Sequence, residues 1–345
     1  MENFEEYMLD MMSKAATALM LSVGHRTKLF DSMSDCTSMT SQKLAEKSNL
    51  NERYIREWLG AMVTGKIVDY DPFSKTYSLS EDKAKLLCKG GSYNFASSMQ
   101  WIPALAFVED KIVKCFEKGG GVPYESFHRF HEVMAEESGQ TTLPALVDSI
   151  LPLVPNLVEN LKKGIKVLDV GCGSGGALNL LAKNFPNSHF TGYDFSKEAI
   201  QNAIKESKKQ GHKNTSFEIQ DVENFSKTEK FDLVTAFDAI HDQAAPAKVL
   251  ENIKAVVKND GIFLMQDIGS SSQLENNQTH PLGPFLYTVS CLHCMTVFLA
   301  LDGHGLGAML GKEKAIEMLK EAGFSNVEIK QLPHDPINYY YIVKP

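Results

Sequence analysis

Hydrophobic and polar residues follow two different patterns along the 345-residue chain, and the pattern changes near residue 164. Before that point apolar residues recur mainly at helical spacing, beginning with residues 3–21. Residues 40–80 predict a helix, a turn, a second helix and a hairpin, which is the order of elements in a winged helix. Residues 91–160 predict a helical connector interrupted by the segment KGGGVP. The residues suited to cap the two helices are Thr40 or Ser41, Asn51 and, at the end of the second helix, Gly65.

From residue 164 onward, short apolar runs alternate with amphipathic segments. The predicted strands are IKVLDV, HFTGYD, TSFEIQ, FDLVTAF and GIFLMQD. Alternation of this kind builds a parallel sheet covered by helices on both faces. Residues 270–310 interrupt the alternation, and the last twenty residues predict a hairpin with the turn PHDPI. The predicted domains are therefore a winged helix at 1–90, the connector at 91–160 and an α/β domain at 161–345.

Charge and cysteine content narrow the function classes. The net charge is −8, and residues 1–90 carry 12 Lys and Arg against 13 Asp and Glu, which argues against a duplex-binding surface. Six cysteines scattered through a long chain fit a reducing compartment better than a disulfide scaffold. The N-terminal sequence lacks the basic segment of a signal peptide, and the longest apolar stretch is too short to span a bilayer. We therefore expect a cytoplasmic protein with no nucleic-acid or membrane partner.

A glycine-rich turn, KVLDVGCGSGG, follows the first predicted strand of the sheet. Gly171, Gly173 and Gly176 satisfy the spacing of a dinucleotide-binding turn, so NAD is one candidate ligand. Asp169 argues against it, because a carboxylate beside the turn would repel a pyrophosphate. S-adenosylmethionine has no phosphate and carries an ammonium and a sulfonium, which both favour nearby acids. The turn residues predicted to bind this cofactor are Asp169, Gly171, Gly173 and Gly175.

Two further acids follow predicted strands, at the edge where ligands bind in open α/β sheets. Asp194 would meet the ribose, and Phe195 would cover the adenine. Asp221 can accept a hydrogen bond from the adenine amino group, with Val222 donating its backbone N–H. With these residues, the chain from about residue 160 to its end resembles the class I S-adenosylmethionine-dependent methyltransferases. The resemblance implies a Rossmann-like, doubly wound, seven-stranded sheet with an antiparallel last strand.

The stretch FDAIHDQ lies where the fourth predicted strand ends. His241 can remove a proton from a methyl acceptor near neutral pH. Asp267, at the end of the fifth strand, is the best candidate to orient the imidazole. Asp242 is adjacent to His241 in sequence, so it is free to point elsewhere, and Asp238 is expected to face the cofactor. His241 and Asp267 are thus the predicted catalytic residues.

The His-Asp pair after the fourth strand, combined with a winged helix, resembles the winged-helix small-molecule O-methyltransferases. The resemblance implies that His241 is the base and that Asp267 orients it. It also implies an N-terminal unit that builds a homodimer and closes one wall of the acceptor pocket. Gln243 stands where that family has a tryptophan. The predicted function is methyl transfer from S-adenosylmethionine to a small aromatic or lipophilic acceptor.

Several alternatives remain open at this stage. Positioning alone suffices to methylate an amine or a thiol, and a winged helix also occurs in cofactor-binding transcriptional regulators. Asp238, Asp242 and Asp267 could instead hold Mg²⁺, although a histidine in their midst favours a base, and no metal is predicted. The motif CLHC has metal-ligand spacing but no second pair, so a buried helix is expected. The candidate pocket residues within the insertion at 270–310 are Tyr287, His293 and His304.

Overall fold

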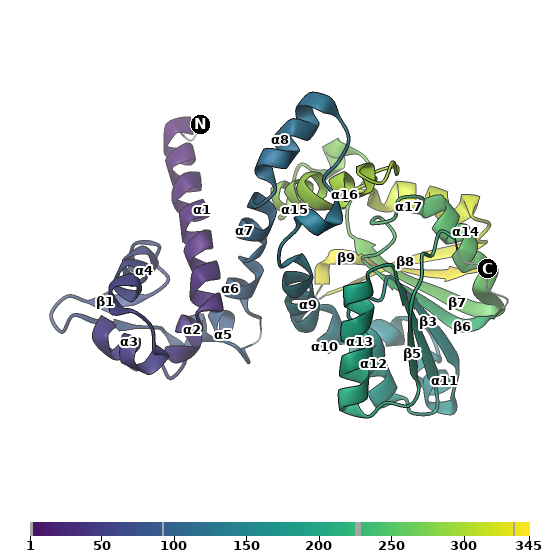
Figure 1. Ribbon diagram of the computed structural model, residues 1–345, viewed down its shortest axis with the longest axis horizontal. Helices are drawn as coiled ribbons and strands as arrows, with labels where there is room; N and C mark the ends of the chain where they lie inside the picture. The colour runs from purple at the N-terminus through teal and green to yellow at the C-terminus, as the bar shows by residue number, and fades with distance from the viewer. Residues whose placement is uncertain (1–2, 92, 225–228, 334) are drawn as a thin grey trace. The chain divides into compact units, whose positions relative to one another are not determined.

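The computed structural model describes residues 3–91, 93–224, 229–333 and 335–345 (Figure 1). It divides into two compact units, one made of Met1–Phe107 with His128–Gln140 and the other of Val108–Phe127 with Thr141–Pro345. The chain therefore passes from one unit to the other three times, and neither unit is a single continuous segment. The connector predicted at 91–160 is shared between the two units.

The first unit contains the predicted winged helix. The two central helices are capped at their starts as expected, because Thr40 accepts a hydrogen bond from the Lys43 N–H and Asn51 accepts one from the Arg53 N–H. The elements of this part are α1 (Phe4–Arg26), α2 (Leu29–Ser32), α3 (Ser41–Ser48), α4 (Glu52–Thr64), β1 (Asp69–Asp71), β2 (Thr76–Ser78) and α5 (Glu81–Leu87). Strands β1 and β2 pair antiparallel and form the wing.

The core of the first unit forms around Trp58 on α4. Its ring packs edge-on against Phe30 at 5.2 Å between centroids, and its indole N–H donates to the Met20 carbonyl at 2.9 Å. Gly24 on α1 makes this packing possible, because a Cβ there would lie 2.6 Å from the Phe30 ring and 2.7 Å from the Trp58 ring. A side chain at that position would therefore push α1 away from α4.

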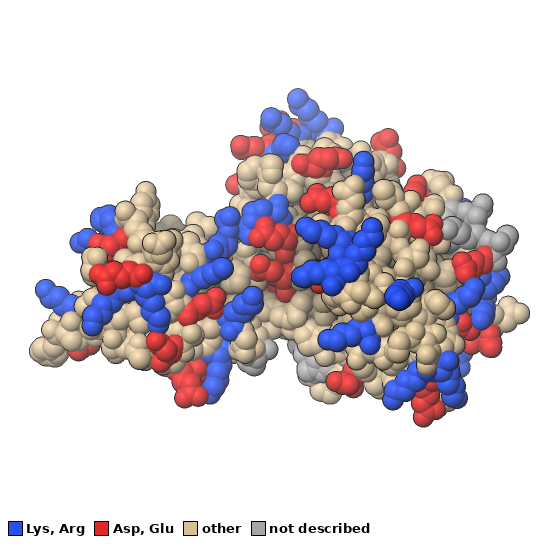
Figure 2. Space-filling model, turned by 60° about the horizontal axis from the view of Figure 1, so that its bottom comes forward, with Lys and Arg blue, Asp and Glu red and all other residues tan. Residues whose placement is uncertain are grey.

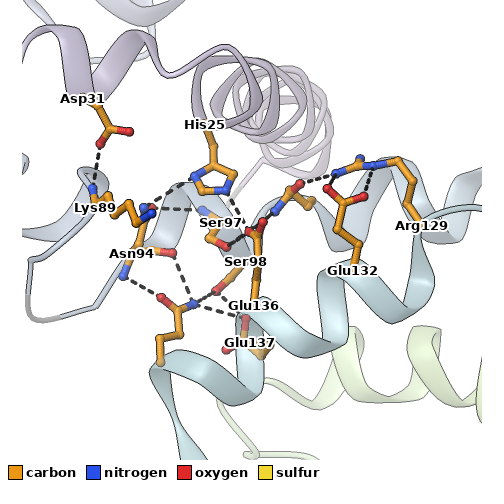
Figure 3. A network of polar contacts seen from close by, with 12 residues as sticks. His25, Asp31, Lys89, Asn94, Ser97, Ser98, Arg129, Glu132, Glu136 and Glu137 are labelled. Atoms are coloured by element: carbon orange, nitrogen blue, oxygen red, sulfur yellow. Dashed lines mark hydrogen bonds and ion pairs between the residues drawn. The ribbon is translucent and has the colours of Figure 1, made fainter. Parts of the chain in front are cut away.

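The remaining helices of the first unit are α6 (Phe95–Ser98), α7 (Trp101–Ala106) and α9 (Phe130–Gln140). A polar network joins α9 to the rest of the unit (Figure 3). One Glu136 oxygen accepts hydrogen bonds from Ser97 at 2.8 Å and Gln100 at 2.7 Å, and lies 2.9 Å from His25 Nε2. Arg129 bonds Gln100 at 2.6 Å and extends the network. These partners come from distant parts of the sequence, so α9 belongs to the fold of this unit.

The second unit is built on a seven-stranded sheet with strand order β5-β4-β3-β6-β7-β9-β8 (Figure 1). The strands are β3 (Lys166–Val170), β4 (His189–Asp194), β5 (Thr215–Ile219), β6 (Phe231–Phe237), β7 (Val257–Ile268), β8 (Asn326–Leu332) and β9 (Asp335–Lys344). Strands β3 to β7 are parallel, and β9 runs antiparallel to both β7 and β8. The predicted fold class is therefore confirmed.

Helices cover both faces of this sheet because the strands are apolar on both sides. Along β3, Val167 belongs to one hydrophobic cluster, and Leu168 and Val170 belong to the other. The first cluster includes residues of α11 (Leu157–Lys163), α12 (Gly176–Asn184) and α13 (Lys197–Gln210). The second includes residues of α14 (Pro246–Val256) and α17 (Gly311–Glu321). The carboxyl ends of the parallel strands remain available for a site.

Two predicted boundaries differ from the structure. The helix predicted to include Lys258 ends at Val256, because β7 begins at Val257 and pairs with Phe231. The predicted terminal turn PHDPI includes residue 334, which lies outside the described residues. The remaining elements of the second unit are α8 (Glu109–Lys118), η1 (Tyr124–Ser126), α10 (Thr142–Ala145), η2 (Leu146–Ile150), η3 (Leu151–Leu153), η4 (Leu274–Asn277), α15 (Gly283–Val289), η5 (Ser290–Cys294) and α16 (Met295–Leu299).

Among the described residues, no single helix has both the length and the apolar character needed to cross a membrane. One strongly bent pair of segments, 130–153 and Leu157–Lys163, meets the requirement by length and composition alone.

Candidate active site

The glycine turn after β3 adopts a backbone that other residues rarely take. Gly171, Gly173 and Gly175 have φ angles of 72°, 51° and 72°. At Gly171 a Cβ would also lie 2.6 Å from the Ala239 Cβ, so the turn passes close to the chain that follows β6. Gly175 is the N-cap of α12. The turn therefore places backbone next to backbone where β3 and β6 end.

A cavity of about 280 Å³ lies at this edge of the sheet. It is lined by Gly171, Tyr193, Asp194, Phe195, Gln220, Asp221, Val222, Glu223, Gln243, Ala244, Phe298 and Leu301. The predicted cofactor-binding residues in this lining are Gly171, Asp194, Phe195, Asp221 and Val222. The structure thus brings together the ends of β3, β4 and β5 with residues from the insertion at 270–310. Asp169, Gly173, Gly175 and Asp238 are not part of this lining.

Asp194 links the glycine turn to the end of β4. One carboxylate oxygen accepts a hydrogen bond from the Gly173 N–H at 2.9 Å, and the other accepts one from the Ser196 N–H at 2.8 Å. Asp221 is held similarly, by the Glu223 N–H at 2.9 Å and the Asn224 amide at 2.7 Å. Both carboxylates are therefore fixed at the cavity before any ligand enters.

Asp169 lies beneath the glycine turn and is 3% exposed. Thr235 on β6 donates a hydrogen bond to its carboxylate at 2.6 Å. Burial raises the pKa of Asp169 to about 7, while the bond from Thr235 opposes this rise and nearby Asp194 adds to it. Asp169 is the group predicted to attract a cationic ligand. Its pKa thus lies near neutral pH, where the ionised and protonated forms are both populated.

Asp238 directly follows β6 with φ 51°, which is unusual for a residue with a side chain. Its carboxylate accepts a hydrogen bond from the Gln266 amide at 2.9 Å and is directed toward β7. Burial, followed by the charge of Asp267, raises the pKa of Asp238 to about 7. The sequence predicts that Asp238 faces the cofactor, but Asp238 does not line the cavity.

His241 is 3% exposed and lies between two carboxylates. Its Nδ1 is 2.7 Å from Asp267 Oδ1, and its Nε2 is 3.3 Å from Asp242 Oδ1. Burial acts to lower the pKa of His241, but the charges of Asp267 and Asp242 outweigh it and raise this pKa well above its usual value. The structure thus joins His241 to Asp267 as the sequence predicts. It also directs Asp242 toward the second ring nitrogen.

The three carboxylates of the alternative Mg²⁺ site do not converge on one point. Asp267 and Asp242 lie on opposite nitrogens of His241, and Asp238 is bonded to Gln266. Of the CLHC motif, Cys294 lies near the ring of His241, while Cys291 is not in that group. The candidate pocket residues of the insertion are placed differently from one another. His293 is buried against Phe127, His304 donates its N–H to Ala244, and Tyr287 lies near Asn277.

Aromatic residues near the site were not predicted from sequence. Tyr124, in the short helix η1, packs edge-on against Phe195 at 6.0 Å and against His293 at 5.6 Å. Phe127 approaches His293 at 4.7 Å. These contacts place the segment around η1 next to the cofactor-cavity residue Phe195. The sequence contains no local pattern at Tyr124 that distinguishes it from a core aromatic, whereas Thr235 is recognisable as a polar residue inside an apolar strand.

The described cavity residues suit S-adenosylmethionine better than a dinucleotide. Asp194, Asp221 and Glu223 line the cavity, and its described lining contains no Lys, Arg or His that could pair with a phosphate. Such an acidic lining favours a ligand with positive charge, and the glycine backbone at Gly171 allows close approach. Asp194 would hold the ribose, and Asp221 with Val222 would hold the adenine.

Comparisons with known proteins agree with this geometry. Residues 15–89 match the family described as the Rv2258c-like winged HTH domain, and residues 161–323 match the family described as a methyltransferase domain. The malonyl-[acyl-carrier protein] O-methyltransferase of Bacillus cereus is 32% identical over 105 residues, which cover 30% of this chain and 38% of that protein. The ubiquinone biosynthesis O-methyltransferase of Coxiella burnetii is 24% identical over 176 residues, covering 51% of this chain and 70% of that protein.

The fold also matches a solved structure along its whole length. Human N-acetylserotonin methyltransferase in complex with SAM aligns with a TM-score of 0.72, covering 100% of this chain and 98% of that one at 15% identity. At this identity the likeness concerns the fold alone. The two family matches define the class, an enzyme that uses S-adenosylmethionine as methyl donor. The chain therefore carries a winged HTH domain followed by a methyltransferase domain, and S-adenosylmethionine is its methyl donor.

Proposed function

We propose that this enzyme methylates a hydroxyl group of a small aromatic or otherwise lipophilic molecule, with His241 as general base. The observation that carries the proposal is the 2.7 Å contact between His241 Nδ1 and Asp267 at the end of β6 and β7. The relatives named as O-methyltransferases support oxygen as the acceptor atom. A base would not be needed for an amine or thiol acceptor, where positioning alone suffices.

Bound S-adenosylmethionine supplies an already activated methyl group, so the protein has to hold the acceptor and accept its proton. Asp267 fixes the imidazole through Nδ1, and Nε2 can receive the proton of the hydroxyl once it has lost the proton that it shares with Asp242. The carboxylate then stabilises the imidazolium that results. Asp267 is therefore a positioning residue, and His241 is the group that touches the acceptor. Because Asp242 now lies beside Nε2, its side chain must give way when the acceptor enters.

The surroundings of the cavity support a neutral, apolar acceptor. Phe195, Phe298 and Leu301 present apolar side chains to the cavity, and Tyr124 packs behind Phe195. Phe298 and Leu301 come from the insertion at 270–310, which supports its proposed role in covering the acceptor.

The test combines a search for the acceptor with substitution of His241. Cell extract incubated with the enzyme and labelled S-adenosylmethionine is searched by mass spectrometry for molecules that gain one methyl group. With the acceptor in hand, His241→Ala is expected to lower kcat by about 10²–10⁴, because the variant lacks the imidazole that takes the proton. The dissociation constant of S-adenosylmethionine should change less than about twofold, since His241 does not line the cofactor cavity.

Two further variants sharpen this test. Asp267→Asn should lower kcat and shift its pH profile while KM stays near the wild-type value, because the imidazole loses its orienting carboxylate. His189→Ala serves as the control histidine, because His189 is exposed at the first residue of β4, away from the carboxyl ends of the strands. Wild-type turnover by His241→Ala would show that this histidine is not the base.

We also propose that the winged helix serves protein contact rather than DNA binding. On α4, Arg53 pairs with Glu57, and Arg56 pairs with Glu52 at 2.7 Å, so these cations are already neutralised. Figure 2 shows acidic and basic side chains interspersed over this part of the molecule. On α1, Phe4, Leu9 and Met12 are more than half exposed, which favours a homodimer through this helix. All six cysteines are free thiols, which supports a cytoplasmic location.

A further inference from the structure

Three side chains of different chemistry meet at one point near His241. The imidazole of His241, the carboxylate of Asp242 and the thiol of Cys294 each offer one ligand atom, and these atoms lie within 4.8 Å of one another. His241 and Cys294 are 3% and 5% exposed. Cys294 ends η5, a π-helical turn in the insertion, so it is brought to His241 by the fold and not by sequence proximity. A π-helical turn inside a helix often marks a functional site.

The hydrogen bonding of His241 leaves a position for a cation. Nδ1 lies 2.7 Å from Asp267, and Nε2 lies 3.3 Å from Asp242 Oδ1. When the ring is charged, its Nε2–H is directed at this carboxylate oxygen, and a metal ion can take the place of that proton between the two atoms. A carboxylate on the far nitrogen is the usual second partner of a metal-bound histidine.

We propose that His241, Asp242 and Cys294 form a binding site for Zn²⁺ or a similar transition-metal ion. Imidazole, thiolate and carboxylate together suit Zn²⁺, whereas Mg²⁺ and Ca²⁺ select oxygen ligands. Tetrahedral coordination with bonds of about 2.0–2.3 Å places the ligand atoms about 3.3–3.7 Å apart. The 3.3 Å between Nε2 and Asp242 Oδ1 fits that geometry without rearrangement. Three protein ligands leave the fourth position for water.

Metal binding at this site switches the enzyme off. The metal takes the Nε2 lone pair that the acceptor proton requires, so the metal-bound form has no free base. This consequence rests on the proposed function, whereas metal binding itself does not. Binding displaces the protons held at His241 Nε2 and at the Cys294 thiol, and both leave to solvent. A chelator is expected to restore turnover in a partly loaded sample.

The binding test uses the full-length protein after removal of metal by dialysis against a chelator. Zn²⁺ is added, and bound metal is counted after gel filtration. Co²⁺ is used in parallel, because a cobalt–thiolate bond gives a charge-transfer band in the near ultraviolet. Wild type is expected to hold about one Zn²⁺ per chain and to show the cobalt band. Cys294→Ala should lose the band and bind Zn²⁺ more than about 100-fold more weakly. This loss is larger than that expected for a residue that only hydrogen-bonds to a metal ligand.

Cys291→Ser is the matched control, because Cys291 lies on the same helical turn and is not one of the three ligands. It should bind Zn²⁺ and Co²⁺ as wild type does. Asp242→Asn removes a second ligand independently, so the proposal stays testable if Cys294→Ala does not fold. Circular dichroism establishes folding for each variant. The proposal is overturned if wild type holds no stoichiometric Zn²⁺, or if a folded Cys294→Ala or Asp242→Asn binds it with wild-type affinity.

The two proposals fail in different ways. Methyl transfer to a hydroxyl that is lost in His241→Ala and unaffected by Zn²⁺ supports the proposed function and refutes the inhibitory site. Stoichiometric Zn²⁺ binding by a protein whose turnover survives His241→Ala supports the site and refutes His241 as the base. Inhibition of wild type by Zn²⁺ that is reversed by chelator, and weakened by Cys294→Ala, supports both.

Discussion

The ionisation of Asp169 predicts how cofactor binding depends on pH. The carboxyl is 3% exposed, and burial raises its pKa to about 7 in the protein without ligand. The ionised form attracts the positively charged groups of S-adenosylmethionine, and the protonated form does not. S-adenosylmethionine therefore binds mainly to protein in which Asp169 is ionised. Raising the pH through neutrality should lower the dissociation constant of the cofactor.

The size of the effect follows from this pKa. At about pH 6 roughly one-eleventh of the Asp169 carboxyls are ionised, and at about pH 8 roughly ten-elevenths are. The dissociation constant of S-adenosylmethionine should therefore fall about tenfold over this interval, which corresponds to about 1.4 kcal/mol. In Asp169→Asn the side chain has no charge at either pH, so the tenfold change should be absent.

The assay is isothermal titration calorimetry of wild type and Asp169→Asn at both pH values. The amino group of the cofactor titrates in the same range, but it does so equally with both proteins. The difference between the two pH slopes therefore isolates Asp169. Equal slopes would refute the reasoning, because they would mean that the charge of Asp169 does not reach the ligand.

The same group affects stability in the opposite direction. The folded pKa of about 7 lies above the ordinary 3.8, so the folded protein holds this proton more tightly than the unfolded chain. The resulting stabilisation is complete below about pH 4 and is lost as the pH rises to about 7, and it amounts to about 4 kcal/mol. Without cofactor, Asp169→Asn should therefore melt at a higher temperature than wild type at about pH 8.

Three further predictions concern the cofactor site and the assembly. Asp194→Ala should weaken S-adenosylmethionine binding about 10- to 100-fold, because it removes charged hydrogen bonds, and unchanged affinity in calorimetry would contradict its role. Gly171→Ala should lower the free energy of unfolding by about 1–3 kcal/mol in urea titration, since its φ is 72° and the new Cβ would meet Ala239. Gly139→Ala, with open space around it, should cost little. Met12→Glu should convert the proposed homodimer to folded monomers in light scattering, and an unchanged mass would exclude this face of α1 as the interface.

The fold could be predicted from sequence because its information is local. The alternation of apolar strands and amphipathic helices after residue 164 indicates the parallel sheet, and the caps Thr40 and Asn51 mark the winged-helix helices. The acids at strand ends, Asp194 and Asp221, could be placed at one edge because parallel strands end together. Asp267 could be paired with His241 for the same reason.

The parts of the site that escaped prediction depend on contacts between distant segments. Cys294 reaches His241 only through the folding of the insertion, and Tyr124 reaches Phe195 from a segment that was expected to be a connector. Asp242 was expected to point elsewhere because neighbours in sequence often diverge, yet the turn after β6 directs it to Nε2. Sequence periodicity carries no information on such side-chain directions.

The three crossings of the chain between its two units affect how the molecule is made. Helix α9 completes the first unit, and its residue Glu136 receives the bonds of Ser97, Gln100 and His25. During synthesis the first unit cannot finish folding until residue 140 has left the ribosome, by which time residues 108–127 of the other unit have already emerged. A chain shortened to its winged-helix sequence would expose the surface that α9 covers. Exchange of whole domains with a related enzyme therefore requires cuts at three places and not one.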